Sequence, residues 1–297
     1  MKPMLVTGAT GFVGSYLVPE LLSRGHRVRC LVRSTTPRHL QRPGVELVRG
    51  DITAPGSLDE ACAGAGGIVH LAAIIREKGR ATFQRVNAEG TQHLVAAAQR
   101  AGVGRFIHMS NLSVTGPQPA YPFLHSKWLG EEAVREGGLA YTIFRPSVLF
   151  GPEDRFINVL ADLVRRLPVV PVIGPGRTRF QLISVAEVAR CLASALGEDR
   201  FSGQTVELGG PEHLSYEDII DLIIRTLGKR RVKVHIPLPF MRPAVWAMER
   251  LLPQPPVTSQ QLKMLAQDNI TDLDIVERWC GFRPIPLAEG MGYIRRR

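Results

Sequence analysis

Three glycines near the amino terminus constrain this chain more than any other feature. Gly8, Gly11 and Gly14 follow the apolar run Met4–Val6 and open a helical pattern that begins at Val13. At this spacing the first glycine permits a tight turn, the second lets the backbone approach a pyrophosphate, and the third lets a helix pack closely on a strand. The loop therefore predicts a site for a nicotinamide dinucleotide. The cofactor-binding residues predicted on it are Gly8, Thr10, Gly11, Phe12, Val13 and Gly14.

Short apolar runs alternate with longer helical patterns over the first half of the chain. The runs predicted as strands are Met4–Val6, Val28–Val32, Val45–Val48, Ile68–Leu71, Phe106–Met109 and Tyr141–Phe144. The stretches predicted as helices are Val13–Arg24, Leu58–Ala63, Phe83–Arg100 and Pro122–Glu136. Strands rich in Val, Ile and Leu are typical of parallel sheets, and parallel strands joined by helices require right-handed crossovers. We therefore expect an α/β fold, a Rossmann-like, doubly wound parallel sheet with a small C-terminal lobe.

The regular alternation ends near residue 150. Beyond it, prolines and glycines interrupt the chain, and two further helices are predicted over Val185–Leu196 and Tyr216–Leu227. We expect a dinucleotide-binding domain over residues 1–150. Residues 151–297 are expected to form a smaller, partly interleaved lobe that meets a substrate or a partner.

Charge and cysteine usage narrow the class of partner. The net charge of +10 favours anionic partners such as phosphates, an acidic protein surface or anionic lipid. No stripe of Lys and Arg with interleaved aromatic residues occurs, so no nucleic-acid partner is expected. The four cysteines form no C-x-x-C pair, which predicts neither a metal site nor a disulfide framework. With no run of about 18 apolar residues and no signal-peptide pattern, we expect a cytoplasmic protein.

The residues after the second predicted strand bear on the choice between NAD and NADP. An acidic residue at this place would bind the ribose 2′-hydroxyl of NAD, but the chain has Arg33 followed by Ser34. A cation suits a 2′-phosphate. NADP is therefore favoured over NAD, although Arg33 as a solvated loop residue stays an alternative.

The stretch 240–252 is strongly apolar and carries arginines. Three interpretations stay open for it: a lobe helix packed on the core, the lining of a pocket for an apolar substrate, or a helix at a membrane surface. His70, His108 and His125 lack metal-ligand spacing with a third partner, so we interpret them as core or loop histidines.

Further motifs resemble the short-chain dehydrogenase/reductase superfamily in its extended or atypical branches. These motifs are Gly50-Asp51-Ile52, His70-Leu71-Ala72-Ala73, Asn87-Ala88-Glu89-Gly90-Thr91, Ser126-Lys127, Arg145-Pro146 with its following Phe150-Gly151-Pro152, and the stretch 180–189. The resemblance covers residues 1 to about 230. It implies that the cofactor is also lined by Asp51, Ile52, Leu71, Ala72, Ala73, Asn87, Met109, Ser110, Lys127, Pro146, Ser147 and Val148.

The run Thr258–Asn269 resembles a narrower group. That group contains the NAD(P)H-binding accessory subunit of mitochondrial complex I and its bacterial relatives. The resemblance implies a place within a larger protein assembly as one option.

The catalytic pattern of the superfamily is incomplete. Active members carry a Tyr four residues before the Lys on one helix face, and this Tyr exchanges a proton with the substrate. Lys127 matches the Lys, but Phe123 stands at the tyrosine position. Tyr121 precedes Pro122 and could act only from outside the helix. Asn111 replaces the substrate-orienting hydroxyl, although its amide can still hydrogen-bond a carbonyl. The candidate catalytic residues are therefore Lys127, Tyr121 and Asn111.

These features leave three functions open. The first is an oxidoreductase that reduces a carbonyl or quinone-like compound without the usual tyrosine. The second is a non-catalytic NADP(H)-binding module or redox sensor in a larger assembly. The third, which the missing tyrosine argues against, is a sugar-nucleotide epimerase or dehydratase. The substrate is unassigned, and a peripheral membrane contact stays open.

Overall fold

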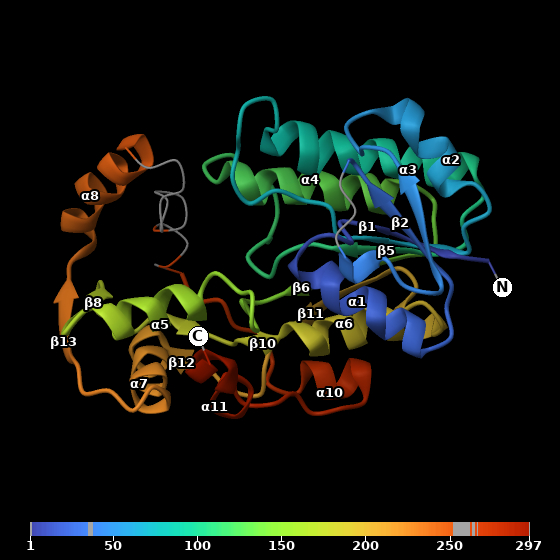
Figure 1. The fold of residues 1–297 in the computed structure, drawn as a ribbon. Helices are drawn as coiled ribbons and strands as arrows, with labels where there is room; N and C mark the ends of the chain where they lie inside the picture. Colours follow the sequence, from blue (N-terminus) through green and yellow to red (C-terminus); the bar gives the residue numbers. More distant parts are fainter. Residues whose placement is uncertain (1, 35–37, 252–261, 263–264, 266, 297) are drawn as a thin grey trace. The chain divides into compact units, whose positions relative to one another are not determined.

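A computed structural model describes residues 2–34, 38–251, 262, 265 and 267–296. The chain divides into two compact units (Figure 1). Unit 1 comprises Met1–Pro146 and Val185–Leu208, and unit 2 comprises Ser147–Ser184 and Gly209–Arg297. Residues 185–208 thus return to unit 1 after a segment of unit 2.

Unit 1 is built on one seven-stranded sheet with the order β11-β6-β5-β4-β1-β2-β3. Its strands are β1 (Met4–Thr7), β2 (Val28–Val32), β3 (Val45–Arg49), β4 (Gly67–His70), β5 (Phe106–Met109), β6 (Tyr141–Pro146) and β11 (Gln204–Leu208). Every neighbouring pair is parallel. The expected Rossmann-like parallel sheet is confirmed, and the strand order reverses between β1 and β4, where such sheets bind ligands.

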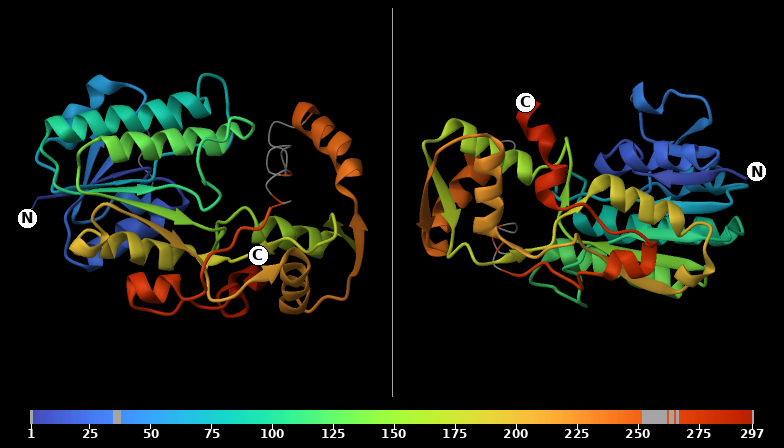
Figure 2. Two further views of the ribbon diagram at one scale, coloured as in Figure 1. Left: turned by 180° about the vertical axis from the view of Figure 1, so that it is seen from behind. Right: turned by 90° about the horizontal axis from the view of Figure 1, so that it is seen from below.

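Helices cover both faces of this sheet. They are α1 (Phe12–Ser23), α2 (Leu58–Cys62), α3 (Gly90–Arg100), α4 (Pro122–Glu136) and α6 (Val185–Ser194). Figure 1 shows α2, α3 and α4 on one face and α1 with α6 on the other, and α1 (blue) lies beside α6 (yellow) in both views of Figure 2. The five inner strands are mostly buried between these layers, which explains why they read as nearly continuous apolar runs, whereas the edge strands β3 and β11 are partly exposed.

The stretch 83–100 is helical throughout, as predicted, but its first part is not a regular α-helix. A π-helix, Gln84–Glu89, precedes α3. The Asn87 side chain bonds both backbone groups of Ile74 and also Ser126, and the Thr91 hydroxyl donates to the carbonyl of Asn87 at 2.7 Å. Wide π turns often occur at functional sites, and here the turn accompanies the inward placement of Asn87.

Unit 2 consists of short strands and helices around its own core. The strands are β7 (Leu149–Phe150), β8 (Val169–Ile173), β9 (Arg179–Phe180), β10 (Ile183–Ser184), β12 (Leu214–Ser215) and β13 (Val232–Ile236). The helices are α5 (Ile157–Arg166), α7 (Tyr216–Thr226), α8 (Leu238–Leu251), α10 (Ile275–Cys280) and α11 (Leu287–Gly290). The strands pair as β7–β10, β9–β12 and β8–β13. The apolar faces of α5 and α7 enclose the core of the unit.

The helices predicted over 185–196 and 216–227 are confirmed as α6 and α7 to within two residues at each end. A capping box begins α7: the Ser215 hydroxyl accepts from the Asp218 N–H, and the Asp218 carboxylate accepts from the Ser215 N–H.

Two sequence features fall partly outside the described residues. Of the run 258–269, only Leu262, Leu265 and residues 267–269 are described. The apolar stretch 240–252 is described except for residue 252. None of the helices in the described part of the chain is both long and apolar enough to cross a lipid bilayer.

Candidate functional site

The carboxyl ends of the parallel strands of unit 1 bring most of the predicted cofactor residues to one edge. Gly8 follows β1, Arg33 and Ser34 follow β2, Asp51 and Ile52 follow β3, Leu71 to Ala73 follow β4, Met109 ends β5 and is followed by Ser110, and Pro146 ends β6. Because the carboxyl ends of parallel strands lie at the same edge, residues up to about 140 positions apart share one rim of the sheet. This rim is the candidate site.

The glycine loop leaves no room for side chains at two of its positions. Gly8 has φ +72°, and a Cβ there would lie 2.7 Å from the backbone nitrogen of Ala72. A Cβ on Gly14 would lie 2.5 Å from the carbonyl oxygen of Gly8 and 2.6 Å from Ala9 Cα. All these neighbours are backbone atoms, which cannot move aside, so glycine is required at both positions.

The middle glycine is open instead. Gly11 is exposed and is the N-cap of α1, and its N–H donates to the Gly8 carbonyl at 3.0 Å. A Cβ on Gly11 would approach only Gly8 O, at 3.2 Å. Gly11 has no side chain with which to cap α1, so its place at the start of this 12-residue helix leaves the first N–H groups without an N-cap side-chain bond. An exposed, bare backbone at a helix N-terminus fits a pyrophosphate. Thr10 is also exposed, Phe12 is half-buried and Val13 is buried.

Beneath the loop, a buried histidine joins β1 to β4. The Thr7 hydroxyl lies 2.6 Å from His70 Nδ1, and His70 Nε2 lies 3.0 Å from the Thr91 hydroxyl. The Thr91 hydroxyl already donates to the Asn87 carbonyl, so it accepts from Nε2–H, and Thr7 donates to Nδ1. Burial, aided by the nearby Lys127 charge, lowers the pKa of His70 to about 3. This neutral tautomer fixes the strand ends against which Gly8 packs.

Asn87 is fully engaged within the protein. Its Oδ1 accepts from the N–H of Ile74 at 2.9 Å, and its Nδ2 donates to the Ile74 carbonyl and to the Ser126 hydroxyl. All of its donor hydrogens are therefore used. Asn87 shapes the loop after β4 and ties that loop to α4.

Side chains after β2 and β3 flank the rim. Arg33 and Ser34 are both exposed at the end of β2. One Asp51 oxygen accepts from the N–H and the hydroxyl of Thr53, at 2.8 and 2.9 Å, which fixes the turn after β3. Ile52 is buried, and a Cβ on Gly90 would lie 2.9 Å from its Cδ1. Gly90 therefore lets α3 begin directly against Ile52.

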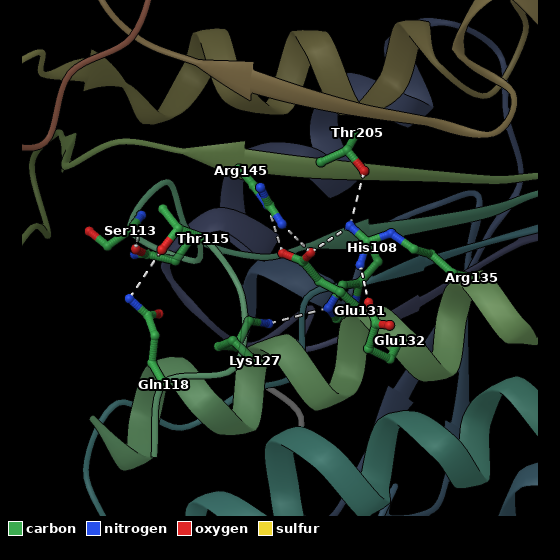
Figure 3. Close-up of polar contacts among 11 residues, drawn as sticks. His108, Ser113, Thr115, Gln118, Lys127, Glu131, Glu132, Arg135, Arg145 and Thr205 are labelled. Carbon is green, nitrogen blue, oxygen red and sulfur yellow. Dashed lines mark hydrogen bonds and ion pairs between the residues drawn. The ribbon is translucent and has the colours of Figure 1, made fainter. Parts of the chain in front are cut away.

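Lys127 is a buried cation on α4. Its Nζ donates to the Met109 carbonyl at 2.7 Å and lies 3.5 Å from His108 Nε2 (Figure 3). Burial lowers the pKa of Lys127 to about 8, although the charge of Glu131 acts in the opposite direction. The pKa of His108 is also held well below its usual value by burial and by the charge of Lys127. The ammonium thus sits at the end of β5, next to Ser110.

The positions expected to handle a proton are occupied differently. Phe123 packs its ring edge-on against Phe83, with the ring centroids 5.7 Å apart. Asn111 Oδ1 accepts from the Ser113 N–H at 2.9 Å and so closes an Asx turn. Tyr121 is the N-cap residue of α4, with φ −125°, outside the helix as the sequence predicted. The amide oxygen of Asn111 is thus used to close a turn. At residue 123 the helix carries no side chain that can donate a proton.

A buried ion cluster lies one turn after Lys127. Glu131 is fully buried and receives a bidentate pair from Arg145, at 2.9 and 2.6 Å, together with a bond from Arg135 at 2.7 Å (Figure 3). Burial opposes ionisation, but these arginines hold the pKa of Glu131 below its ordinary value. This cluster was not predicted from the sequence. The signal was available, because Glu131 follows Lys127 by four residues and shares its helix face.

Two predicted cofactor residues belong to unit 2. The Ser147 hydroxyl donates to the Gln181 carbonyl, and the N–H of Val148 donates to Asn269 Oδ1 at 3.2 Å. Asn269 also exchanges backbone bonds with Arg179 and Gln181, so the described end of the run 258–269 orders this part of unit 2.

A seven-stranded parallel sheet with a glycine turn at its switch point defines unit 1 as a Rossmann-type fold. Residues 4–209 match the NAD dependent epimerase/dehydratase family, and the chain belongs to that family.

The relatives of the chain include a subunit of NADH dehydrogenase and a reductase. A match to NADH dehydrogenase (ubiquinone) 1 alpha subcomplex subunit 9, mitochondrial, from Arabidopsis thaliana is 30% identical over 91% of this chain and 73% of the relative. A match to a ceramide reductase from Caulobacter vibrioides is 37% identical over 64% of this chain and 59% of the relative. Among solved structures, that of gox2253 has a TM-score of 0.79 at 27% identity and covers 99% of this chain and 97% of that one. The family is NAD dependent, and the solved structures of a dTDP-glucose 4,6-dehydratase from Streptomyces venezuelae and of MoeE5 contain bound NAD.

Proposed function

We propose that unit 1 binds NADP(H), in preference to NAD(H), along the carboxyl rim of its sheet. The observation that carries the proposal is the glycine loop: Gly8 and Gly14 are held against backbone, and Gly11 leaves the first N–H groups of α1 uncovered. Oriented N–H groups and the positive end of the helix favour a pyrophosphate here.

The preference for NADP rests on the end of β2. Arg33 and Ser34 are exposed beside the rim, where a carboxylate would select NAD. A guanidinium can donate two hydrogen bonds to a 2′-phosphate.

We propose further that the chain reduces a carbonyl or quinone-like compound by a route that does not use residue 123. Bound NADPH supplies the hydride. Lys127, already oriented by the Met109 carbonyl, turns its ammonium to the ribose hydroxyls and so positions the cofactor. Phe123 has no proton to give, so the developing oxyanion takes its proton from water or from Tyr121. The ceramide reductase relative supports a reductase of this kind.

A non-catalytic role is the second candidate. The edge-on packing of Phe123 on Phe83 and the engaged Oδ1 of Asn111 favour it, because both positions serve structure where a reductase places its acid and its orienting hydroxyl. In this role bound NADP(H) is a structural element or a redox sensor in a larger protein assembly. The Arabidopsis relative, named as a subunit of NADH dehydrogenase, supports this alternative. A sugar-nucleotide epimerase or dehydratase is disfavoured, because Phe123 cannot exchange the required proton.

Cofactor binding is tested at Gly11. Gly11→Ala adds a methyl group that meets only Gly8 O at 3.2 Å, so the fold should persist while the pyrophosphate is pushed away. We expect NADPH affinity, measured by calorimetric titration, to fall by about tenfold or more, or about 1.4 kcal/mol. The matched control is Gly56→Ala, where a Cβ meets nothing within 4 Å. A wild-type protein that binds neither NADPH nor NADH would refute the proposal.

The two candidate roles separate at residue 123. With NADPH bound, the wild-type protein should reduce a soluble quinone or a lipid-like ketone slowly, and Phe123→Tyr should raise the rate about tenfold or more by supplying an acid four residues from Lys127. Phe123→Leu is the control for lost packing on Phe83. If neither the wild type nor Phe123→Tyr turns over NADPH that both bind, the non-catalytic role is favoured.

A further inference from the structure

The two strands β8 and β13 of unit 2 form a small sheet with one apolar face. They are parallel and in register, with Val232 opposite Val169 and Val234 opposite Pro171. Alternate residues of a strand point to the same side, so one face carries Val169, Pro171, Ile173, Val232, Val234 and Ile236. Val232 is 64% exposed, Val234 47% and Val169 43%. The face is therefore uncovered at its three valines.

The opposite face of the same two strands holds the buried and charged residues. Val170 and Val172 are fully buried in the core of unit 2. Lys233 pairs with Glu217 at 2.7 Å and with Asp221 at 2.8 Å, and His235 lies 3.3 Å from Glu217. The two acids of α7 are thus paired with Lys233 of β13 on the inner side, and the outer face of both strands is entirely apolar.

Cations gather where both strands begin. Arg165 and Arg166 precede β8, and Lys229, Arg230 and Arg231 precede β13. Because the strands are parallel and in register, these two segments lie at the same end. Arg231 joins them directly, since its Nε donates to the Val164 carbonyl at 2.7 Å and its Nη2 to the Arg165 carbonyl at 3.3 Å. Arg166, Lys229 and Arg230 are exposed.

We propose that this surface, the valine face of β8 and β13 with its cationic end, docks on a bilayer that contains anionic lipid. Contiguous exposed apolar residues on a folded protein mark an interaction site. The adjoining lysine and arginines are attracted to a negatively charged surface, and β13 and β8 lie side by side next to α5, which carries two of these cations at its end (Figure 1). The valines enter the interface between lipid headgroups and acyl chains. The proposal goes beyond cofactor binding and does not depend on it.

The test is co-sedimentation of the full chain with vesicles. Phosphatidylcholine vesicles with and without phosphatidylglycerol are compared at low and high salt. The protein should bind only the vesicles with phosphatidylglycerol, and salt should weaken binding. Lys229→Gln with Arg230→Gln should lower the partition coefficient about fivefold for each cation lost. Val232→Ser with Val234→Ser should lower it about tenfold and leave its salt dependence unchanged.

Matched variants in unit 1 control for general effects. Arg27→Gln with Arg42→Gln removes two exposed cations elsewhere, and Leu47→Ser removes an exposed apolar side chain elsewhere. These variants should bind vesicles like the wild type, and circular dichroism should show every variant folded. Failure of the wild type to bind phosphatidylglycerol vesicles at low salt overturns the proposal. The proposal is also overturned if the wild type is an oligomer in solution and the Val232→Ser, Val234→Ser variant is a monomer. The valine face would then bind a second copy of the chain.

Discussion

The glycine loop and the helix α4 meet the same rim of unit 1 but differ in what they retain. The loop has glycine at each position where a side chain would meet backbone or cover the start of α1. The helix retains Lys127 and the buried Glu131 with its arginine partners. At residue 123, however, it has a phenylalanine where the superfamily resemblance predicts a proton donor. The difference indicates that holding a dinucleotide and supplying a proton are separable physical demands.

The two regions are also stabilised differently. The loop depends on backbone geometry and close contact, which a methyl group added at Gly8 or Gly14 disturbs. The helix depends on charges in a buried setting, where pairing and desolvation oppose each other. Substitutions should therefore affect the loop through steric contacts and α4 through ionisation.

The largest effect is expected at Glu131. Glu131→Gln leaves the guanidinium groups of Arg145 and Arg135 without their buried carboxylate, and breaking a buried pair costs about 3–5 kcal/mol. Urea unfolding should show that loss. Glu132→Gln is the control, because Glu132 pairs with the same Arg135 while more exposed, and it should change stability by less than about 0.5 kcal/mol. Equal losses in the two variants would mean that burial of the cluster does not matter.

A somewhat smaller effect is expected at Gly8. Gly8→Ala places a Cβ 2.7 Å from Ala72 N at φ +72°, and backbone strain plus overpacking should cost roughly 2–4 kcal/mol in unfolding free energy. Gly25→Ala isolates the strain: Gly25 has φ +81°, and a Cβ there meets nothing within 4 Å. That variant should lose only about 1 kcal/mol. The contact argument fails if the two variants are equally destabilised.

The next prediction is that the buried ammonium of Lys127 lowers the free energy of unfolding of the wild type. Its pKa is about 8 in the folded protein and 10.5 when unperturbed, so between these values the unfolded chain holds more protons and stability rises with pH. Below pH 8 the buried charge costs about 3 kcal/mol, at about 1.4 kcal/mol per pKa unit. Lys127→Met loses the bond to the Met109 carbonyl, worth about 1 kcal/mol, and should gain a net ~2 kcal/mol at pH 7.

The measurement is urea unfolding of Lys127→Met and the wild type from pH 7 to pH 10. The advantage of the variant should shrink as pH rises through 8, while its NADPH affinity should already be lower at pH 7. A variant less stable than the wild type at pH 7 would mean that Lys127 is a net structural contributor.

The sequence predicted the fold well because the fold depends on local patterns. The apolar runs from Met4 to Phe144 are observed as parallel strands, and the end of α4 at residue 136 is observed as predicted. The π-helix at Gln84–Glu89 was missed, because its apolar pattern resembles that of an ordinary helix and only the contacts of Asn87 distinguish it.

Less of the site could be predicted, because it depends on contacts across the sheet. The Thr7–His70–Thr91 chain joins three distant segments, and His70 was interpreted only as a core or loop histidine. The Glu131 cluster unites α4 and β6: the spacing from Lys127 places Glu131 on one helix face, but it does not reveal that Arg145 of β6 lies beside it. The apolar face of β8 and β13 likewise emerges only from their pairing. The cofactor roles of Arg33, Asp51 and the other rim residues stay predictions.

The smallest effect on stability is expected at Arg33, and it tests how the rim beside the glycine loop selects its nucleotide. Arg33→Ala removes an exposed cation at the end of β2 and should leave unfolding free energy within about 0.5 kcal/mol of the wild type. NADPH affinity should fall about tenfold, or about 1.4 kcal/mol, while NADH affinity stays constant, because only NADPH carries the 2′-phosphate.

The control is Arg42→Ala, which removes another exposed cation of unit 1 and should change neither affinity. High salt should reduce the difference in NADPH affinity between the wild type and Arg33→Ala, because salt screens an exposed guanidinium–phosphate pair. Titrations at low and high salt measure this. A wild-type protein with equal affinities for the two nucleotides would leave Arg33 a solvated loop residue, and the rim would then hold the dinucleotide through backbone and Lys127 alone.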